Sequence, residues 1–164
     1  MSSSVSDTSA AYRWEGLLID SNLLLLLFVG LYDPTRIQKF KRTAQFTVED
    51  FELLVAFIER FKEVVTTPSI LTEVSNLLGQ LPEGLKYSLY EHFADAIKDL
   101  YEHYTPSQEL GNEKAFPKFG LTDTAILQAA SGKYLVLTDD FRLTQYLKGL
   151  NIDVINFNHL RTFD

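Results

Sequence analysis

Short apolar runs separated by longer segments with helical periodicity are the feature that most limits the folds open to this chain. The runs cover residues 17–19, 64–66, 134–137 and 152–155. Apolar runs of this length, without polar alternation, are typical of strands buried on both faces. Strands that alternate with helices predict a parallel sheet covered on both sides. We therefore expect an α/β fold, with three α/β/α layers around a central parallel sheet of about four to five strands.

Capping residues mark where the intervening helices begin and end. Ser21 and Asn22 can cap a helix in the leucine run that follows. Thr47 and Asp50 have the spacing of a capping box, and Thr67 followed by Pro68 is a helix start. The expected helices run from the leucine run to about residue 33 and then over about 47–62, 68–78, 83–104 and 122–130, the last capped by Thr122. Asp139 or Asp140 opens a further helix that ends at Gly149, and residues 107–119 are expected to be irregular.

Composition narrows the classes of function. The 164 residues include no cysteine, which excludes a disulfide framework, a zinc–thiolate site and a cysteine nucleophile. The net charge of −7 argues against nucleic-acid binding through a globally basic surface, so any such contact must be local. The apolar run at 23–29 is too short to cross a membrane. We expect a disordered lead-in over residues 1–12 and a single domain over residues 13–164. We also expect no membrane association and a cytoplasmic location.

Five acidic residues are expected at one edge of the sheet. Asp20 follows the first strand directly, and Asp139 and Asp140 follow the third. Glu73 lies in the helix after the second strand, and Asp123 lies in the first turn of a later helix. Ligands of open parallel sheets bind beyond the carboxyl ends of the strands, so these carboxylates are expected to converge there.

Clustered carboxylates repel one another unless a positive charge lies among them. Oxygen ligands without nearby His or Cys favour Mg²⁺ or Mn²⁺ as that charge. An Asp at a helix start is usually a cap, which is the alternative interpretation of Asp20, Asp123 and Asp140 taken singly. Caps occur at every helix start, however, whereas these acids are all expected around one pocket.

Four motifs, in order along the chain, carry a family resemblance. They are LIDSNLL at 18–24, TPSILTEV at 67–74, GLTDTAIL at 120–127 and LVLTDDF at 135–141. With these motifs the chain resembles the PIN-domain nucleases over about residues 16–156. Each motif is short, and it is their order and their expected placement in strands and helices that make the resemblance specific.

The resemblance implies a metal-dependent endoribonuclease, commonly a bacterial toxin silenced by an antitoxin protein. It implies RNA as the substrate and Mg²⁺ or Mn²⁺ as the cofactor. On this resemblance the catalytic residues would be Asp20, Glu73, Asp123 and Asp140. The metal ligands would be Asp20, Asp123 and Asp140, with Asp139 as an extra acid. Asn22 and Thr138 would support the site. The leucine-rich helix and the helix at 83–104 are candidates for a homodimer interface, and packing in the core explains both of them equally well.

A basic cluster of Arg36, Lys39, Lys41 and Arg42 is the first candidate for local RNA contacts, although a solvated charged segment is the simpler explanation. Lys118, Lys133 and Arg142 are secondary candidates because they lie close in sequence to the acidic motifs.

Other classes of protein share parts of this pattern. A phosphatase of the haloacid-dehalogenase type would need a second Asp at the position of Asn22, so the sequence argues against that class. A receiver domain would need a lysine at the end of the last strand, where this chain has Ile155 and Asn156, so the sequence argues against that class too. A PIN-like scaffold without catalysis and a DNA-directed, structure-specific nuclease stay open as alternatives.

Overall fold

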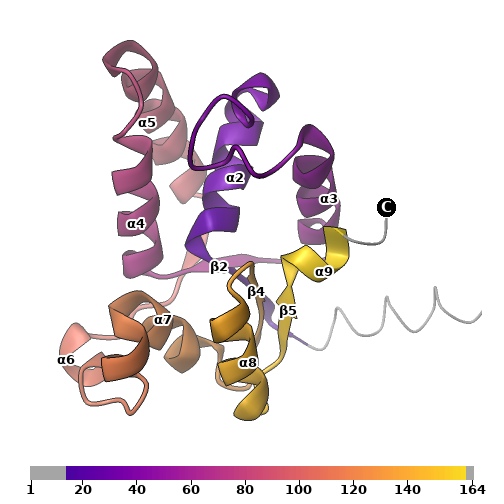
Figure 1. The fold of residues 1–164 in the computed structure, drawn as a ribbon. Helices are drawn as coiled ribbons and strands as arrows, with labels where there is room; N and C mark the ends of the chain where they lie inside the picture. The colour runs from indigo at the N-terminus through magenta and orange to yellow at the C-terminus, as the bar shows by residue number, and fades with distance from the viewer. Residues whose placement is uncertain (1–13, 162–164) are drawn as a thin grey trace, which may run out of the picture.

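One sheet of five parallel strands forms the middle of the protein, with helices on both faces (Figure 1). The computed structural model describes residues 14–161, so the expected lead-in over residues 1–12 lies outside the described residues. The strands are β1 (Gly16–Ile19), β2 (Val64–Thr66), β3 (Tyr101–Glu102), β4 (Tyr134–Thr138) and β5 (Val154–Asn156). This arrangement confirms the three-layer α/β/α class.

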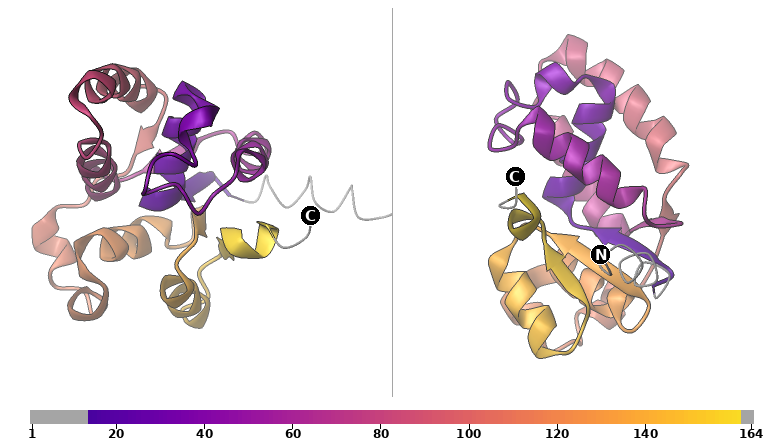
Figure 2. Two further views of the ribbon diagram at one scale, coloured as in Figure 1. Left: turned by 45° about the horizontal axis from the view of Figure 1, so that its top comes forward. Right: turned by 90° about the vertical axis from the view of Figure 1, so that its right-hand side faces the viewer.

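The helices divide between the two faces of the sheet (Figures 1 and 2). On one face lie α2 (Ser21–Tyr32), α3 (Val48–Ile58), α4 (Pro68–Leu78) and α5 (Glu83–Ile97). On the other lie α6 (Ser107–Leu110), α7 (Phe116–Ala130) and α8 (Phe141–Gly149). A 3₁₀ turn, η1 (Pro34–Arg36), follows α2, and α9 (Phe157–Arg161) follows β5. No helix within residues 14–161 has both the length and the apolar character needed to span a bilayer.

The leucine-rich helix α2 is buried nearly all round. Its residues from Leu23 to Val29 are almost completely shielded from solvent. A helix that is apolar on every side must be covered on every side, and α2 packs against α3, α4 and α5 while its first turn follows β1. The helix therefore fixes Asp20, the residue between β1 and α2, at the centre of the molecule.

The strand order β3-β2-β1-β4-β5 places β1 between β2 and β4. The chain extends the sheet in one direction from β1 to β3 and then crosses to the other side of β1 to form β4 and β5. Such a change of direction opens a crevice between the two strands at their carboxyl ends, where ligands of parallel sheets bind. Ile19 pairs with Leu137 at these ends, so the residues that follow β1 and β4 are neighbours.

The expected long helix over residues 83–104 is wrong in its last turns. Helix α5 ends at Ile97, and Tyr101 and Glu102 form the edge strand β3, paired in parallel with Val65 and Thr66. A strand of two residues has no periodicity that a sequence pattern could reveal, because its pairing comes from a distant partner strand.

Residues 107–119, expected to be irregular, contain α6 and the first turn of α7. Helix α7 is kinked at Gly120, whose φ of 80° lies in the left-handed region that glycine adopts without strain. Thr122 is therefore not the cap that the sequence predicts, and the hydroxyl of Thr124 instead donates to the Gly120 carbonyl at 2.6 Å.

Smaller differences concern the ends of elements. Helix α3 ends at Ile58 rather than near residue 62, and the last strand covers 154–156 rather than 152–155. The cap of α2 is Asp20 rather than Ser21 or Asn22. The capping box of Thr47 and Asp50 and the helix start at 67–68 are confirmed.

Candidate active site

A pocket of about 300 Å³ lies at the carboxyl edge of the sheet, where β1 and β4 end. Five carboxylates from separate parts of the chain line it, those of Asp20, Glu73, Asp123, Asp139 and Asp140. Its other lining residues are Ser21, Asn22, Phe119, Leu121 and Thr122. The structure therefore brings together in one pocket the five acids that the sequence singles out, and Asn22 with them.

Asp20 is held rigidly by its neighbours. Its backbone extends β1, with its N–H donating to the Leu137 carbonyl at 3.0 Å. The carboxylate Oδ1 accepts from the Ser21 N–H at 2.8 Å, and Oδ2 accepts from the Thr138 hydroxyl at 2.7 Å. The side chain is 9% exposed, so its position is set by the fold rather than by solvent.

Thr138 connects Asp20 to Asp140. The fully buried Thr138 hydroxyl donates to Asp20 and accepts from the Asp140 N–H at 3.1 Å. Asp140 caps α8 because its Oδ1 accepts from the Leu143 N–H at 3.0 Å. One hydroxyl thus orients the residues that follow β1 and β4, which is the supporting position expected for Thr138.

The remaining acids are held more loosely. Glu73 is exposed, and its Oε1 lies 3.5 Å from the Ser21 hydroxyl. Asn22 donates to the Asp139 carboxylate across 3.4 Å, which is a long hydrogen bond. Asp123 stands in α7, three residues after the Gly120 kink. These side chains can move further than Asp20 without breaking a short hydrogen bond.

The crowded acids resist ionisation. Burial raises the pKa of Asp20 to about 6, against the opposing hydrogen bonds from Thr138 and Ser21. Burial, followed by the charges of Asp20, Asp140 and Glu73, raises the pKa of Asp123 to about 7. Burial also raises the pKa of Asp139. The pocket therefore holds negative charge that the protein alone compensates incompletely.

The chemistry of the donors fits a hard divalent cation, because the polar lining groups are carboxylate, amide and hydroxyl oxygens. Within residues 14–161, however, no three His, Cys, Asp or Glu side chains are placed as a group that could hold a metal ion. An ion would have to draw the loosely held carboxylates towards Asp20. Glu73 is an exposed side chain that can make this movement.

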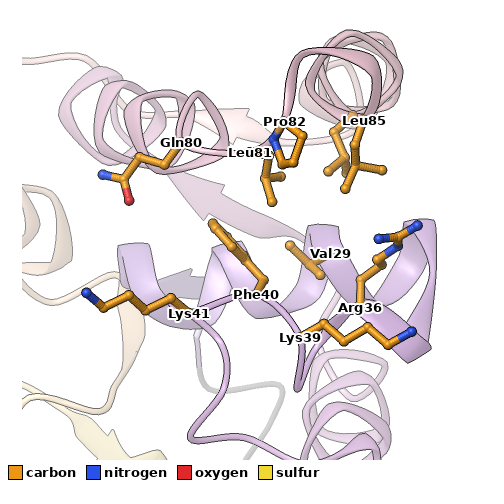
Figure 3. Close-up of a pocket in the computed structure, with 10 residues that line it drawn as sticks. Val29, Arg36, Lys39, Phe40, Lys41, Gln80, Leu81, Pro82 and Leu85 are labelled. Carbon is orange, nitrogen blue, oxygen red and sulfur yellow. The ribbon is translucent and has the colours of Figure 1, made fainter.

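The basic cluster lies outside the acidic pocket. Arg36, Lys39 and Lys41 line a second pocket of about 370 Å³, together with apolar side chains of α2, α5 and the α4–α5 turn (Figure 3). Arg42 donates to Gln80 at 3.0 Å at the same end of α4. Glu73 of the acidic pocket and Gln80 of the second pocket are seven residues apart, so about 10 Å separates them along the chain direction.

Sequence reasoning missed four residues of the acidic pocket, Ser21, Phe119, Leu121 and Thr122. The last three lie beside Gly120, where α7 is kinked. The only sequence signal for this was the glycine itself, which marks a break inside an otherwise helical pattern.

A comparison of the chain with models of protein families and with curated proteins found no match. The resemblance to PIN-domain nucleases therefore stays a prediction that depends on the four motifs.

Proposed function

We propose that this protein is a metal-dependent nuclease that hydrolyses phosphodiester bonds in RNA, similar to the PIN-domain nucleases. The observation that carries the proposal is the meeting of five carboxylates in one pocket at the switch point of the sheet. Burial and mutual repulsion raise the pKa of Asp20 and Asp123, so a cation bound there would relieve a strong local repulsion. A scaffold protein gains nothing from such a cluster.

The residues divide into two roles in this proposal. Asp20, Asp123 and Asp140 are the principal metal ligands, with Asp139 as an additional ligand and Glu73 completing the site. A bound Mg²⁺ or Mn²⁺ supplies a Lewis acid that activates water and offsets charge on the phosphodiester. Thr138 keeps the Asp20 carboxylate facing the pocket through its hydrogen bond of 2.7 Å. Asn22 donates a long hydrogen bond of 3.4 Å to Asp139.

The direct test is cleavage of a mixed RNA substrate by the purified protein with Mn²⁺, with Mg²⁺ and with EDTA. We expect cleavage that requires the metal and that falls about a hundredfold or more in Asp20→Asn. The matched control is Asp95→Asn, which makes the same chemical change on the exposed surface of α5 and should cleave like wild type.

Two other outcomes would replace the proposal. If wild type cleaves no RNA and calorimetry detects no Mn²⁺ binding, the acids serve as helix caps in a scaffold protein. If a branched or flapped DNA is cut and RNA is not, the protein is a structure-specific DNA nuclease.

Growth arrest on expression, relieved in Asp20→Asn, would extend the proposal to a toxin with a cognate antitoxin.

A further inference from the structure

Two cations and two aromatic rings form a cluster beside the acidic pocket. The rings of Phe119 in α7 and Tyr146 in α8 lie 4.6 Å apart between centroids. The Arg142 guanidinium carbon lies 4.9 Å from the Phe119 centroid. The Lys118 ammonium lies 5.4 Å from the centroid of Phe119 and 5.7 Å from that of Tyr146. We call these four residues the cation–aromatic cluster.

The cluster borders the acidic pocket directly. Phe119 is a lining residue of that pocket. Arg142 follows Asp140 by two residues and lies close enough to Asp123 to lower its pKa, against the larger effect of burial. The two cations therefore stand at the edge of the carboxylate site rather than on a remote surface.

Neither cation is neutralised by the acids beside it. Among residues 14–161, Lys118 and Arg142 form no ion pair with any carboxylate. The aromatic faces hold both cations, through the attraction between a cation and the negative face of a ring. Their charge is left available to an anion that approaches the pocket.

An exposed aromatic ring completes this surface. Phe141 is the first residue of α8, between Asp140 and Arg142, and its side chain is 66% exposed. Exposed phenylalanine is unfavourable in water, but it is the kind of side chain on which an unpaired base stacks.

We propose that Lys118 and Arg142 form a phosphate clamp for a single-stranded polynucleotide whose flanking base stacks on Phe141. The inference rests on the proposed nuclease function and names the strand-binding surface of the same site. The clamp answers the objection raised by the net charge of −7, because only two local cations need to face the strand. A single strand fits better than a duplex, since bases within a duplex cannot reach Phe141.

The test measures the affinity of a fluorescein-labelled 12-nucleotide RNA, and of the same sequence in DNA, by anisotropy over a range of salt concentrations. Wild type is measured with EDTA, and the Asp20→Asn protein with Mg²⁺, so that no strand is cut in either case. Each neutralised phosphate contributes about 0.7 to the slope of log K against log salt for a single strand. The double variant Lys118→Gln/Arg142→Gln should therefore have a slope about 1.4 shallower, with at least tenfold weaker binding at low salt.

Matched variants separate this site from a general charge effect. Lys86→Gln/Lys98→Gln removes the same charge from α5 and its C-cap, where Lys86 lies over the Tyr90 ring. This variant should bind like wild type. Phe141→Ser should weaken binding without changing the salt slope, because stacking releases no counterion.

Each outcome decides between the two proposals. An unchanged salt slope in Lys118→Gln/Arg142→Gln overturns the clamp, whatever the cleavage assay shows. The clamp is also overturned if the strand binds neither to wild type with EDTA nor to Asp20→Asn with Mg²⁺. Strand binding that depends on these two cations, in a protein that cuts nothing, leaves the clamp standing and overturns the nuclease. The loss of affinity in the double variant should be the same for the RNA and the DNA strand, since both present the same phosphates.

Discussion

Replacing Asp20 with Asn should stabilise the metal-free protein at alkaline pH and much less at acid pH. The carboxylate is 9% exposed and its pKa is raised to about 6, chiefly by burial, from an ordinary value of 3.8. A carboxyl whose folded-state pKa lies above its unfolded value favours the folded state below the unfolded pKa. That contribution is lost as the pH rises through the folded pKa of about 6. The neutral amide introduced by Asp20→Asn carries no such dependence.

The size of the effect follows from the two pKa values. A folded pKa of about 6 against about 3.9 in the unfolded chain makes the ionised side chain cost about 3 kcal/mol at pH 8. The same linkage costs less than about 1 kcal/mol at pH 4. The stability gained by Asp20→Asn should therefore be about 2 kcal/mol larger at pH 8 than at pH 4. Loss of the Asp20 charge also lowers the pKa of Asp123, which adds to the effect in the same direction.

Urea unfolding of wild type and Asp20→Asn at the two pH values, with EDTA present, measures this difference. Any hydrogen bond that the amide makes less well with Thr138 contributes equally at both pH values and cancels in the comparison. Asp95→Asn on the exposed face of α5 should gain no such stability at pH 8, because it removes one partner of the Lys98 ion pair and not a buried charge. An equal change in unfolding free energy at both pH values would show that Asp20 ionises normally, and the electrostatic account of the pocket would be wrong.

Three further predictions concern the same site and its support. Thr138→Val removes a hydrogen bond that lowers the pKa of Asp20, so the pH at which metal-dependent cleavage begins should rise, as a pH–rate profile would show. Mn²⁺ should raise the melting temperature more at pH 8 than at pH 5.5, because its ligands must be deprotonated, and EDTA should reverse the shift in a thermal melt. Gly30→Ala places a methyl group against the Phe51 ring where α2 meets α3, and it should lower the unfolding free energy by about 1–3 kcal/mol in urea unfolding.

Patterns within single segments predicted most of the fold. The apolar runs of β1 and β4 are buried in the centre of the sheet, and their lack of alternation is what central parallel strands require. The edge strand β3 was missed because two half-exposed residues next to a long amphipathic helix look like its last turn. Its existence depends on pairing with β2, about 35 positions earlier in the chain, which local pattern does not record.

The meeting of Asp20 with Asp139 and Asp140 could be predicted because the sheet topology determines it. Residues that follow parallel strands meet at one edge, so Asp20 and Asp140 had to be near one another once β1 and β4 were neighbours. The cation–aromatic cluster could not be predicted in this way. Lys118 and Arg142 meet through the ring of Phe119, whose direction depends on the kink at Gly120 and on the packing of α7 against α8.

Capping and metal binding are not competing roles for these acids. Asp20 caps α2 with Oδ1, and its Oδ2 is directed to Thr138 at the sheet edge. Asp140 caps α8 with Oδ1 alone, and within residues 14–161 its Oδ2 accepts no hydrogen bond. A cap fixes the carboxylate at the end of a strand, and the partial positive charge of the helix N-terminus reduces the repulsion that such acids cause one another. The helix starts can therefore both build the fold and hold the charge that a cation would bind.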